Sequence, residues 1–276
     1  MAPNSLFKKI DVYPYGICIA VGVLSCIAVL FLYSKKRGIP QQLQDYIFFI
    51  GIFAIAFGFL SAKFFQAVYD WVDSGFKHFS FVGAGITAMG GFIGGAAIFL
   101  IAYFSLARFV FKGKKKNLHK KHLNELLAVA PICIVIAHAF GRVGCLMAGC
   151  CHGAYLGEDY VFGGIYMEGT TDGWGYYVPT QLYEALFLFL LFAVLSILYF
   201  KGCNIILPIY LISYGVWRMI IEFFRTDERG GFFLSLSPSQ WMSILFLIIG
   251  IVMIIIYVCK KIPLFQKPKQ AEEKQS

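Results

Sequence analysis

Seven long runs of apolar residues, free of Asp, Glu, Lys and Arg, alternate with polar segments along this chain of 276 residues. A helix that crosses the ~30 Å hydrocarbon core of a bilayer needs about 20 predominantly apolar residues, and most of the runs approach or exceed this length. The pattern predicts an all-α integral membrane protein with seven transmembrane helices, over residues 12–34, 46–62, 78–107, 126–141, 185–200, 202–217 and 230–259.

The first run raises the question of a signal peptide, because Lys8 and Lys9 precede it. It is too long for the hydrophobic region of a signal peptide, shows no small-residue cleavage site and leads directly into further apolar runs. We therefore expect a membrane domain over residues 1–262, followed by a polar, disordered cytoplasmic tail over residues 263–276.

Lysine and arginine are concentrated in alternate segments between the runs. They follow the first, third, fifth and seventh runs, whereas acidic residues follow the second run and lie between the fourth and the fifth. The positive-inside rule therefore predicts an outside N-terminus and a cytoplasmic C-terminus. The glycine-rich and aromatic-rich segment over residues 154–178 then forms a small outward-facing subdomain with short strands.

The composition agrees with a lipid environment: 59% of the residues are hydrophobic, 14% are charged and the mean hydropathy is +0.72. The basic cytoplasmic segments account for the net charge of +9. They indicate contact with anionic lipid headgroups of the bilayer and no nucleic-acid partner.

Two runs, 126–141 and 202–217, contain only sixteen residues each, which gives about 24 Å of helix. Each helix must therefore include neighbouring ionisable residues: Arg142 in the fourth helix, and Arg218 with Glu222 in the sixth. An ionisable side chain at such a depth costs on the order of 2.5–3.5 kcal/mol and faces a partner or a wet cavity. We expect these side chains to converge in the outer leaflet.

Tyr214, Arg218, Glu222 and Arg225 recur at intervals of four, four and three, which places them on one face of a helix. One interpretation is an internal Arg218–Glu222 pair that neutralises itself. Arg142, which arrives from another helix, favours a second interpretation, in which excess positive charge binds a phosphate through bidentate guanidinium contacts. The expected ligand is a phospholipid headgroup.

Eight cysteines occur in the chain, and three of them, Cys145, Cys150 and Cys151, lie close together in the sequence. The other five, Cys18, Cys26, Cys133, Cys203 and Cys259, lie in or beside apolar runs, where cysteine behaves as a small hydrophobic residue. The spacing of the three with His152 does not supply the two separated ligand pairs of a structural zinc site. We therefore predict no metal and no cofactor.

Four motifs together resemble the prolipoprotein diacylglyceryl transferase family over nearly the whole chain. They are YPYGICIAVG at 13–22, GRVG at 141–144, PTQLYEALF at 179–187 and YGVWRMIIEFFR at 214–225. The resemblance implies a multi-pass enzyme of the bacterial cell membrane with seven spans, an outside N-terminus and an outward active site. It also implies transfer of diacylglyceryl from phosphatidylglycerol to the cysteine thiol of a prolipoprotein signal peptide that carries a lipobox.

The chain departs from the family pattern at several positions. Cys145, Ala148 and Cys150 stand where the family has two asparagines and a glutamate after GRxG, although Gly153 matches the closing glycine. Met89 stands where the family has a histidine before a glycine pair.

Diacylglyceryl transfer requires a nucleophilic thiol and stabilisation of the charge that develops on glycerol phosphate. Arg142 and Arg218 are expected to stabilise that charge, Glu222 to orient Arg218, and His152, or alternatively His138, to handle the proton. The predicted catalytic residues are Arg142, Arg218, Glu222, Tyr214 and His152, and the predicted substrate-binding residues are Tyr15, Gly153, Gln181, Tyr183, Glu184 and Arg225. For Tyr15 and Tyr214 the alternative is a place in the interfacial aromatic belt, and for the start of the fifth helix it is capping by Thr180.

Three functional hypotheses follow. The first is the transferase reaction. The second is a member of the same fold that binds or handles lipid without catalysing transfer, which the substitutions at Met89, Cys145 and Cys150 favour. The third is a membrane thiol oxidoreductase that uses the three clustered cysteines.

Overall fold

The structure is a computed structural model that describes residues 13–83, 85, 87–159, 162–169, 173–225 and 236–265. The described chain is mostly helical and divides into two compact units. One unit comprises Met1–Gly38 together with Asn124–Ser276, and the other comprises Ile39–Leu123. The predicted tail lies, from residue 266 onward, outside the described residues.

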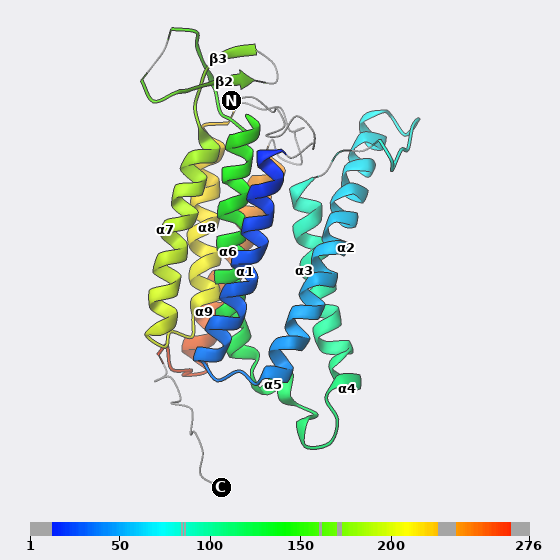
Figure 1. Cartoon of the computed structure of the whole chain (residues 1–276), viewed down its shortest axis with the longest axis vertical. Helices are drawn as coiled ribbons and strands as arrows, with labels where there is room; N and C mark the ends of the chain where they lie inside the picture. Colours follow the sequence, from blue (N-terminus) through cyan, green and yellow to red (C-terminus); the bar gives the residue numbers. More distant parts are fainter. Residues whose placement is uncertain are drawn as a thin grey trace. The chain divides into compact units, whose positions relative to one another are not determined.

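In the described part of the larger unit there are five long helices, and Figure 1 shows them running side by side. They are α1 (Pro14–Lys36), α6 (Leu123–Ala148), α7 (Thr180–Phe200), α8 (Ile206–Glu222) and α9 (Pro238–Cys259). Their inner faces bury a continuous apolar core that includes Val29, Ile132, Leu188, Ile206 and Phe246. Large apolar side chains such as Leu24 and Leu190, each 65% exposed, point outward. An apolar exterior of this kind suits a helical bundle in lipid.

Among the described residues, six helices are long and apolar enough to cross a membrane: Pro14–Lys36, Gln41–Val72, Met89–Val110, Leu123–Ala148, Thr180–Phe200 and Pro238–Cys259. They confirm a helical membrane protein. The run 202–217 forms α8, whose 17 residues correspond to about 26 Å of helix.

The apolar runs located the helices but misplaced several ends. The second helix, α2 (Gln41–Asp73), extends well beyond the predicted 46–62 at both ends. The third, α3 (Ala88–Ser105), begins ten residues later than predicted, after a segment that contains Gly83 and Gly85 and disfavours helix. The last begins at Pro238 because Ser237 and Gln240 form a capping box around a proline in the first turn.

Arg37, just after α1, binds the C-terminal end of α7. Its Nη2 donates to the carbonyl oxygens of Tyr199 at 2.7 Å and Cys203 at 2.9 Å. The guanidinium also lies 4.2 Å from the centre of the Tyr199 ring. A cation at the last carbonyls of a helix satisfies acceptors that have no partner within the helix and complements its dipole. This contact fixes α1 to α7.

Between α6 and α7 the chain forms a three-stranded antiparallel sheet, in the segment for which short strands were expected. The strands are β1 (Tyr155–Gly157), β2 (Ile165–Gly169) and β3 (Gly173–Tyr177), in the order β1-β3-β2. Met167 and Tyr177 are fully buried beneath it. In Figure 1 the labelled strands lie at the end of the bundle where α7 begins.

The smaller unit is a pair of helices, α2 and α3, followed by short turns α4 (Ala107–Val110), η1 (Gly113–Lys115) and α5 (Leu118–Lys121). Glycines lie where the two helices meet most closely. A Cβ added at Gly58 would lie 3.1 Å from the Gly91 carbonyl oxygen, and one at Gly91 would lie 3.2 Å from the Ala62 Cβ. Small residues here let the backbones approach closely.

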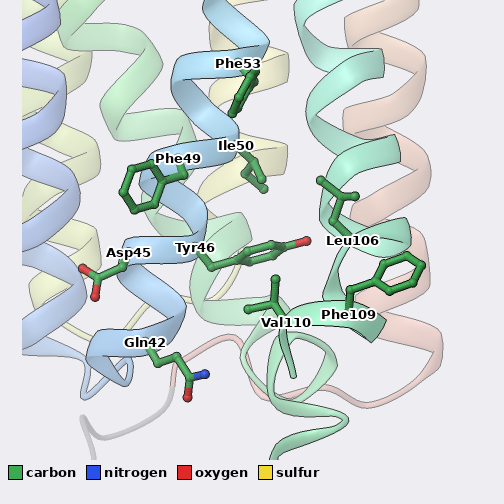
Figure 2. A pocket seen from close by; sticks show the side chains of 9 residues that line it. All are labelled: Gln42, Asp45, Tyr46, Phe49, Ile50, Phe53, Leu106, Phe109 and Val110. Atoms are coloured by element: carbon green, nitrogen blue, oxygen red, sulfur yellow. The ribbon is translucent and has the colours of Figure 1, made fainter. Parts of the chain in front are cut away.

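A cavity of about 430 Å³ lies within the smaller unit, lined by α2 on one side and by Leu106, Phe109 and Val110 on the other (Figure 2). Its wall is almost entirely apolar, with Gln42 and Asp45 at one end. It contains none of the residues predicted to be functional.

Replacing Gly58 by Leu is expected to lower the free energy of unfolding by about 1–3 kcal/mol, because the side chain must displace the α3 backbone. Gly51, two turns earlier on α2, is the matched control, since nothing lies within 4 Å of a Cβ placed there. Thermal unfolding of Gly58→Leu and Gly51→Leu in detergent measures the difference. Equal stability of the two variants would contradict close packing at Gly58.

Candidate active site

Glu184 is the centre of a network of polar side chains in the larger unit. Its side chain is 0% exposed, and Arg142 Nε lies 3.0 Å from its Oε2. Arg218 Nη1 lies 3.6 Å from the same oxygen, and the Tyr214 hydroxyl donates to Oε1 at 3.0 Å. One carboxylate on α7 thus binds groups from α6 and α8.

Arg218 extends the network from α8 to α9. Its Nη2 lies 3.0 Å from Oε2 of Glu222 and donates to the Ser239 hydroxyl at 2.8 Å. The Ser237 hydroxyl donates to Oε1 of Glu222 at 2.5 Å. Because Ser237 is the N-cap of α9, Glu222 also lies at the positive end of that helix dipole.

His138, one turn before Arg142 on α6, completes the centre. Its Nε2 accepts a hydrogen bond from Arg142 Nε at 3.3 Å and lies 3.7 Å from Glu184 Oε1. Its ring packs edge-on against Tyr214, with centroids 5.3 Å apart. The contact with Arg142 requires Nε2 without a proton, whereas the contact with Glu184 favours a proton there. The contact with Arg142 is the shorter of the two, so Nε2 carries no proton in the resting network.

The network carries less positive charge than the sequence predicted. The expectation of excess positive charge set two or three arginines against Glu222 alone, but Glu184 supplies a second carboxylate. Arg142 and Arg218 are therefore balanced, in formal charge, by Glu184 and Glu222. A proton on His138 would make the group as a whole positive.

The two arginines differ in the donors that they have left for a ligand. Arg218 uses both terminal nitrogens, on Glu184, Glu222 and Ser239. Within the described part of the chain, Arg142 contacts Glu184 and His138 through Nε, so Nη1 and Nη2 remain as a fork. The side chain of Arg142 is 14% exposed against 7% for Arg218. Arg142 is therefore the arginine better placed for a phosphate.

Three predicted residues contact the sheet and its loops. Gln181 is fully buried and its Nε2 lies 3.8 Å from the sulfur of Met167. The Tyr183 hydroxyl donates to the Gly163 carbonyl at 3.1 Å. His152 packs on Tyr177, with ring centroids 4.3 Å apart, and its Nδ1 lies 3.0 Å from the Gly153 carbonyl. Of the two histidines considered, His138 is the one that contacts Arg142 and Glu184.

Gly153 fills a position that admits no side chain. A Cβ there would lie 2.2 Å from the Phe224 carbonyl oxygen and 2.8 Å from Thr180 Cγ2. This packing accounts for the glycine without a ligand. The ring of Tyr15 on α1 packs against α6, 3.0 Å from the position of a Cβ at Gly144.

Arg225 does not belong to the helical stripe, because α8 ends at Glu222. Its charge acts instead on Cys151, which follows α6 and lies beside Cys145 and Cys150. Hydrogen bonds with these two thiols, and the charges of Arg225 and Arg142, lower the pKa of Cys151 against the opposing effect of its burial.

Ser237 and Ser239 also belong to the network, although neither was among the residues predicted from the sequence. The available signal was the tetrapeptide SPSQ at 237–240, which has the serine, proline and glutamine of a capped helix start. Its two hydroxyls contact Glu222 and Arg218, a pairing that only the packing of α9 on α8 reveals.

Fold and site together define a multi-pass helical membrane protein whose bundle holds an ionic network at one end. Residues 4–256 match the family model of prolipoprotein diacylglyceryl transferase. The chain belongs to this family.

The chain is also similar in sequence to curated relatives along most of their length. The chain is 31% identical over 258 residues to the phosphatidylglycerol–prolipoprotein diacylglyceryl transferase of Clostridium tetani, covering 88% of this chain and 92% of the relative. It is 32% identical over 253 residues to transferase 2 of that name from Clostridium perfringens, covering 88% and 90%. It is 31% identical over 265 residues to the enzyme of Dehalococcoides mccartyi, covering 94% and 92%.

Replacing Glu184 by Gln is expected to lower the free energy of unfolding by about 3 kcal/mol, because two buried arginines lose a shared counter-charge while the shape is kept. Glu158→Gln, in an exposed loop, is the control and should change stability by less than about 0.5 kcal/mol. Unfolding in detergent monitored by circular dichroism tests both. Equal stability of the two variants would argue against a structural role for the network.

Proposed function

We propose that the protein transfers the diacylglyceryl group of phosphatidylglycerol to the lipobox cysteine of prolipoprotein signal peptides and releases glycerol phosphate. Membership of the family and the names of the relatives support this reaction. The observation that carries the mechanism is the Arg142 fork, held by Glu184 and His138 through Nε alone.

The phosphate of the donor lipid binds to Nη1 and Nη2 of Arg142 in this mechanism. A guanidinium fork matches two phosphate oxygens in a bidentate contact. Glu184 and His138 fix the orientation of Arg142 through its Nε. Little reorganisation is therefore needed when charge develops on the leaving group. Arg218 acts through Glu184 and Glu222 as a positioning residue, since its terminal nitrogens are already bound.

In the transfer step, the lipobox sulfur attacks the glycerol carbon that bears the phosphate ester. The S–C bond forms, the C–O bond breaks, and the electron pair of that bond moves to the phosphate oxygen. His138 Nε2 takes the thiol proton and can return it to the released glycerol phosphate. Protonation of His138 gives the network a net positive charge at the moment when the leaving group becomes more negative.

The membrane setting is part of the proposal. We infer that α8 is the seventh span, that the N-terminus lies outside and that the site faces the outer leaflet of a bacterial cell membrane. The basic residues after α1 and between α3 and α6 support this orientation. The sheet would then face outward as a subdomain that guides the signal peptide.

A lipid-binding protein without transferase activity is the second candidate. The specific observation in its favour is that Met89, Cys145 and Cys150 replace polar residues of the family pattern. The experiment below separates the candidates, because this alternative predicts binding of phosphatidylglycerol with no transfer to a lipobox peptide.

Arg142→Lys should reduce kcat/KM at least about 100-fold, because lysine keeps the charge but loses the bidentate fork. Transfer of radiolabel from phosphatidylglycerol to a lipobox peptide by purified protein measures the effect. Arg108→Lys, at an exposed position on α4, is the matched control and should retain activity. Full activity of a folded Arg142→Lys variant would refute the proposed phosphate contact, and lipid binding without transfer by wild type would favour the second candidate.

The two histidines are distinguished by a pair of substitutions. His138→Gln should lower kcat about 100-fold or more, because the proton acceptor is lost, whereas His152→Gln should retain most of the activity. The same radiolabel assay, run from pH 5 to 9, reports both variants. A larger loss of activity in His152→Gln than in His138→Gln would indicate that His152, and not His138, accepts the proton.

A further inference from the structure

Three thiols converge where α6 ends, outside the network described above. The sulfur atoms of Cys145, Cys150 and Cys151 all lie within 4.8 Å of one another. All three cysteines are free and partly buried. The sequence spacing argued against a metal site because it lacks the two separated ligand pairs of a structural zinc site, but the backbone here brings the three sulfur atoms together.

A helix C-cap brings Cys150 back toward Cys145. Gly149 adopts φ 69°, the Cys150 N–H donates to the Cys145 carbonyl at 3.1 Å and the Gly149 N–H donates to the Leu146 carbonyl at 3.2 Å. This pair of bonds around a left-handed glycine is a Schellman motif. As a result, Cys150 Sγ lies 3.7 Å from the Cys145 carbonyl oxygen.

Cys151 is held in place by contacts with the start of α7. It has φ 63°, a left-handed conformation that is costly for a residue with a side chain. The Thr180 hydroxyl donates to its carbonyl at 2.8 Å, and the Gly153 N–H donates to the Val178 carbonyl at 2.8 Å. The three thiols are therefore presented by a chain segment that is fixed at both ends.

We propose that Cys145, Cys150 and Cys151 form a binding site for one thiophilic metal ion, Cu(I) or Zn(II). Thiolates at about 2.3 Å from a common ion are about 4 Å apart, and these sulfurs lie within 4.8 Å of one another. Three soft ligands in a trigonal arrangement favour Cu(I), and Zn(II) would complete a tetrahedron with one further ligand.

Binding changes protonation and charge but needs no oxidant. Three thiols release three protons, so Zn(II) gives a site of charge −1 and Cu(I) gives a site of charge −2. Arg142 and Arg225 both interact electrostatically with Cys151 and offset part of this negative charge. The surroundings therefore suit a thiolate-bound ion.

Metal binding by the purified full chain tests the proposal. Protein reduced and handled without oxygen is incubated with Cu(I) or with Zn(II), freed of unbound ion by gel filtration and measured by mass spectrometry of the metal. We expect about one ion per chain, and at least about tenfold weaker binding in each of Cys145→Ser, Cys150→Ser and Cys151→Ser. Cys259→Ser, at an exposed position on α9, is the control and should bind as wild type does.

A second measurement needs no variant. The bound ion should protect three of the eight cysteines from alkylation in the wild-type chain, and X-ray absorption should show sulfur ligands at about 2.3 Å. A competition between Cu(I) and Zn(II) for the same protein identifies the ion that binds more tightly. The proposal is overturned if fully reduced wild type retains no more of either ion than the triple serine variant. The assay does not depend on transferase activity.

Discussion

The buried carboxylate of Glu184 is the interaction on which the architecture of the larger unit depends. A carboxylate removed from solvent is tolerated only when cations and donors surround it, and Glu184 obtains them from α6 and α8. Glu222 continues the connection to α9 through Ser237. Since lipid provides no hydrophobic drive for helix association, these polar contacts specify which helices meet and at what height.

In the proposed mechanism, the same arrangement prepares the site for chemistry on a phosphate ester. Contacts within the protein orient both guanidinium groups before a ligand binds. Each carboxylate is itself held by contacts with an arginine and a hydroxyl group. The balanced formal charge stabilises the resting network, and a proton on the histidine beside Arg142 would alter this balance. Stability and reactivity therefore share one set of contacts.

Much of this could be predicted from the sequence, because intramembrane charges need partners. The charge-free runs located the helices, and the short runs indicated that Arg142 and Arg218 lie within helices and converge. What failed depends on local geometry that no periodicity encodes. The start of α9 follows from one serine cap, the end of α8 at Glu222 removes Arg225 from the stripe, and the left-handed Gly149 gathers three thiols whose linear spacing disfavoured a cluster. Glu184 was predicted to bind substrate, but its position just before the fifth apolar run does not reveal that its carboxylate joins α6 and α8.

The clamp that Arg37 makes on the last carbonyls of α7 has a mechanical consequence. Helix α7 is anchored by charge at both extremities, through Glu184 near its first turn and through Arg37 beyond its last. Sliding of α7 along its axis would break one of these two contacts, so its axial position is fixed. A bilayer thicker or thinner than the helix is then accommodated by inclination of the bundle as a body and not by movement of α7 relative to its neighbours.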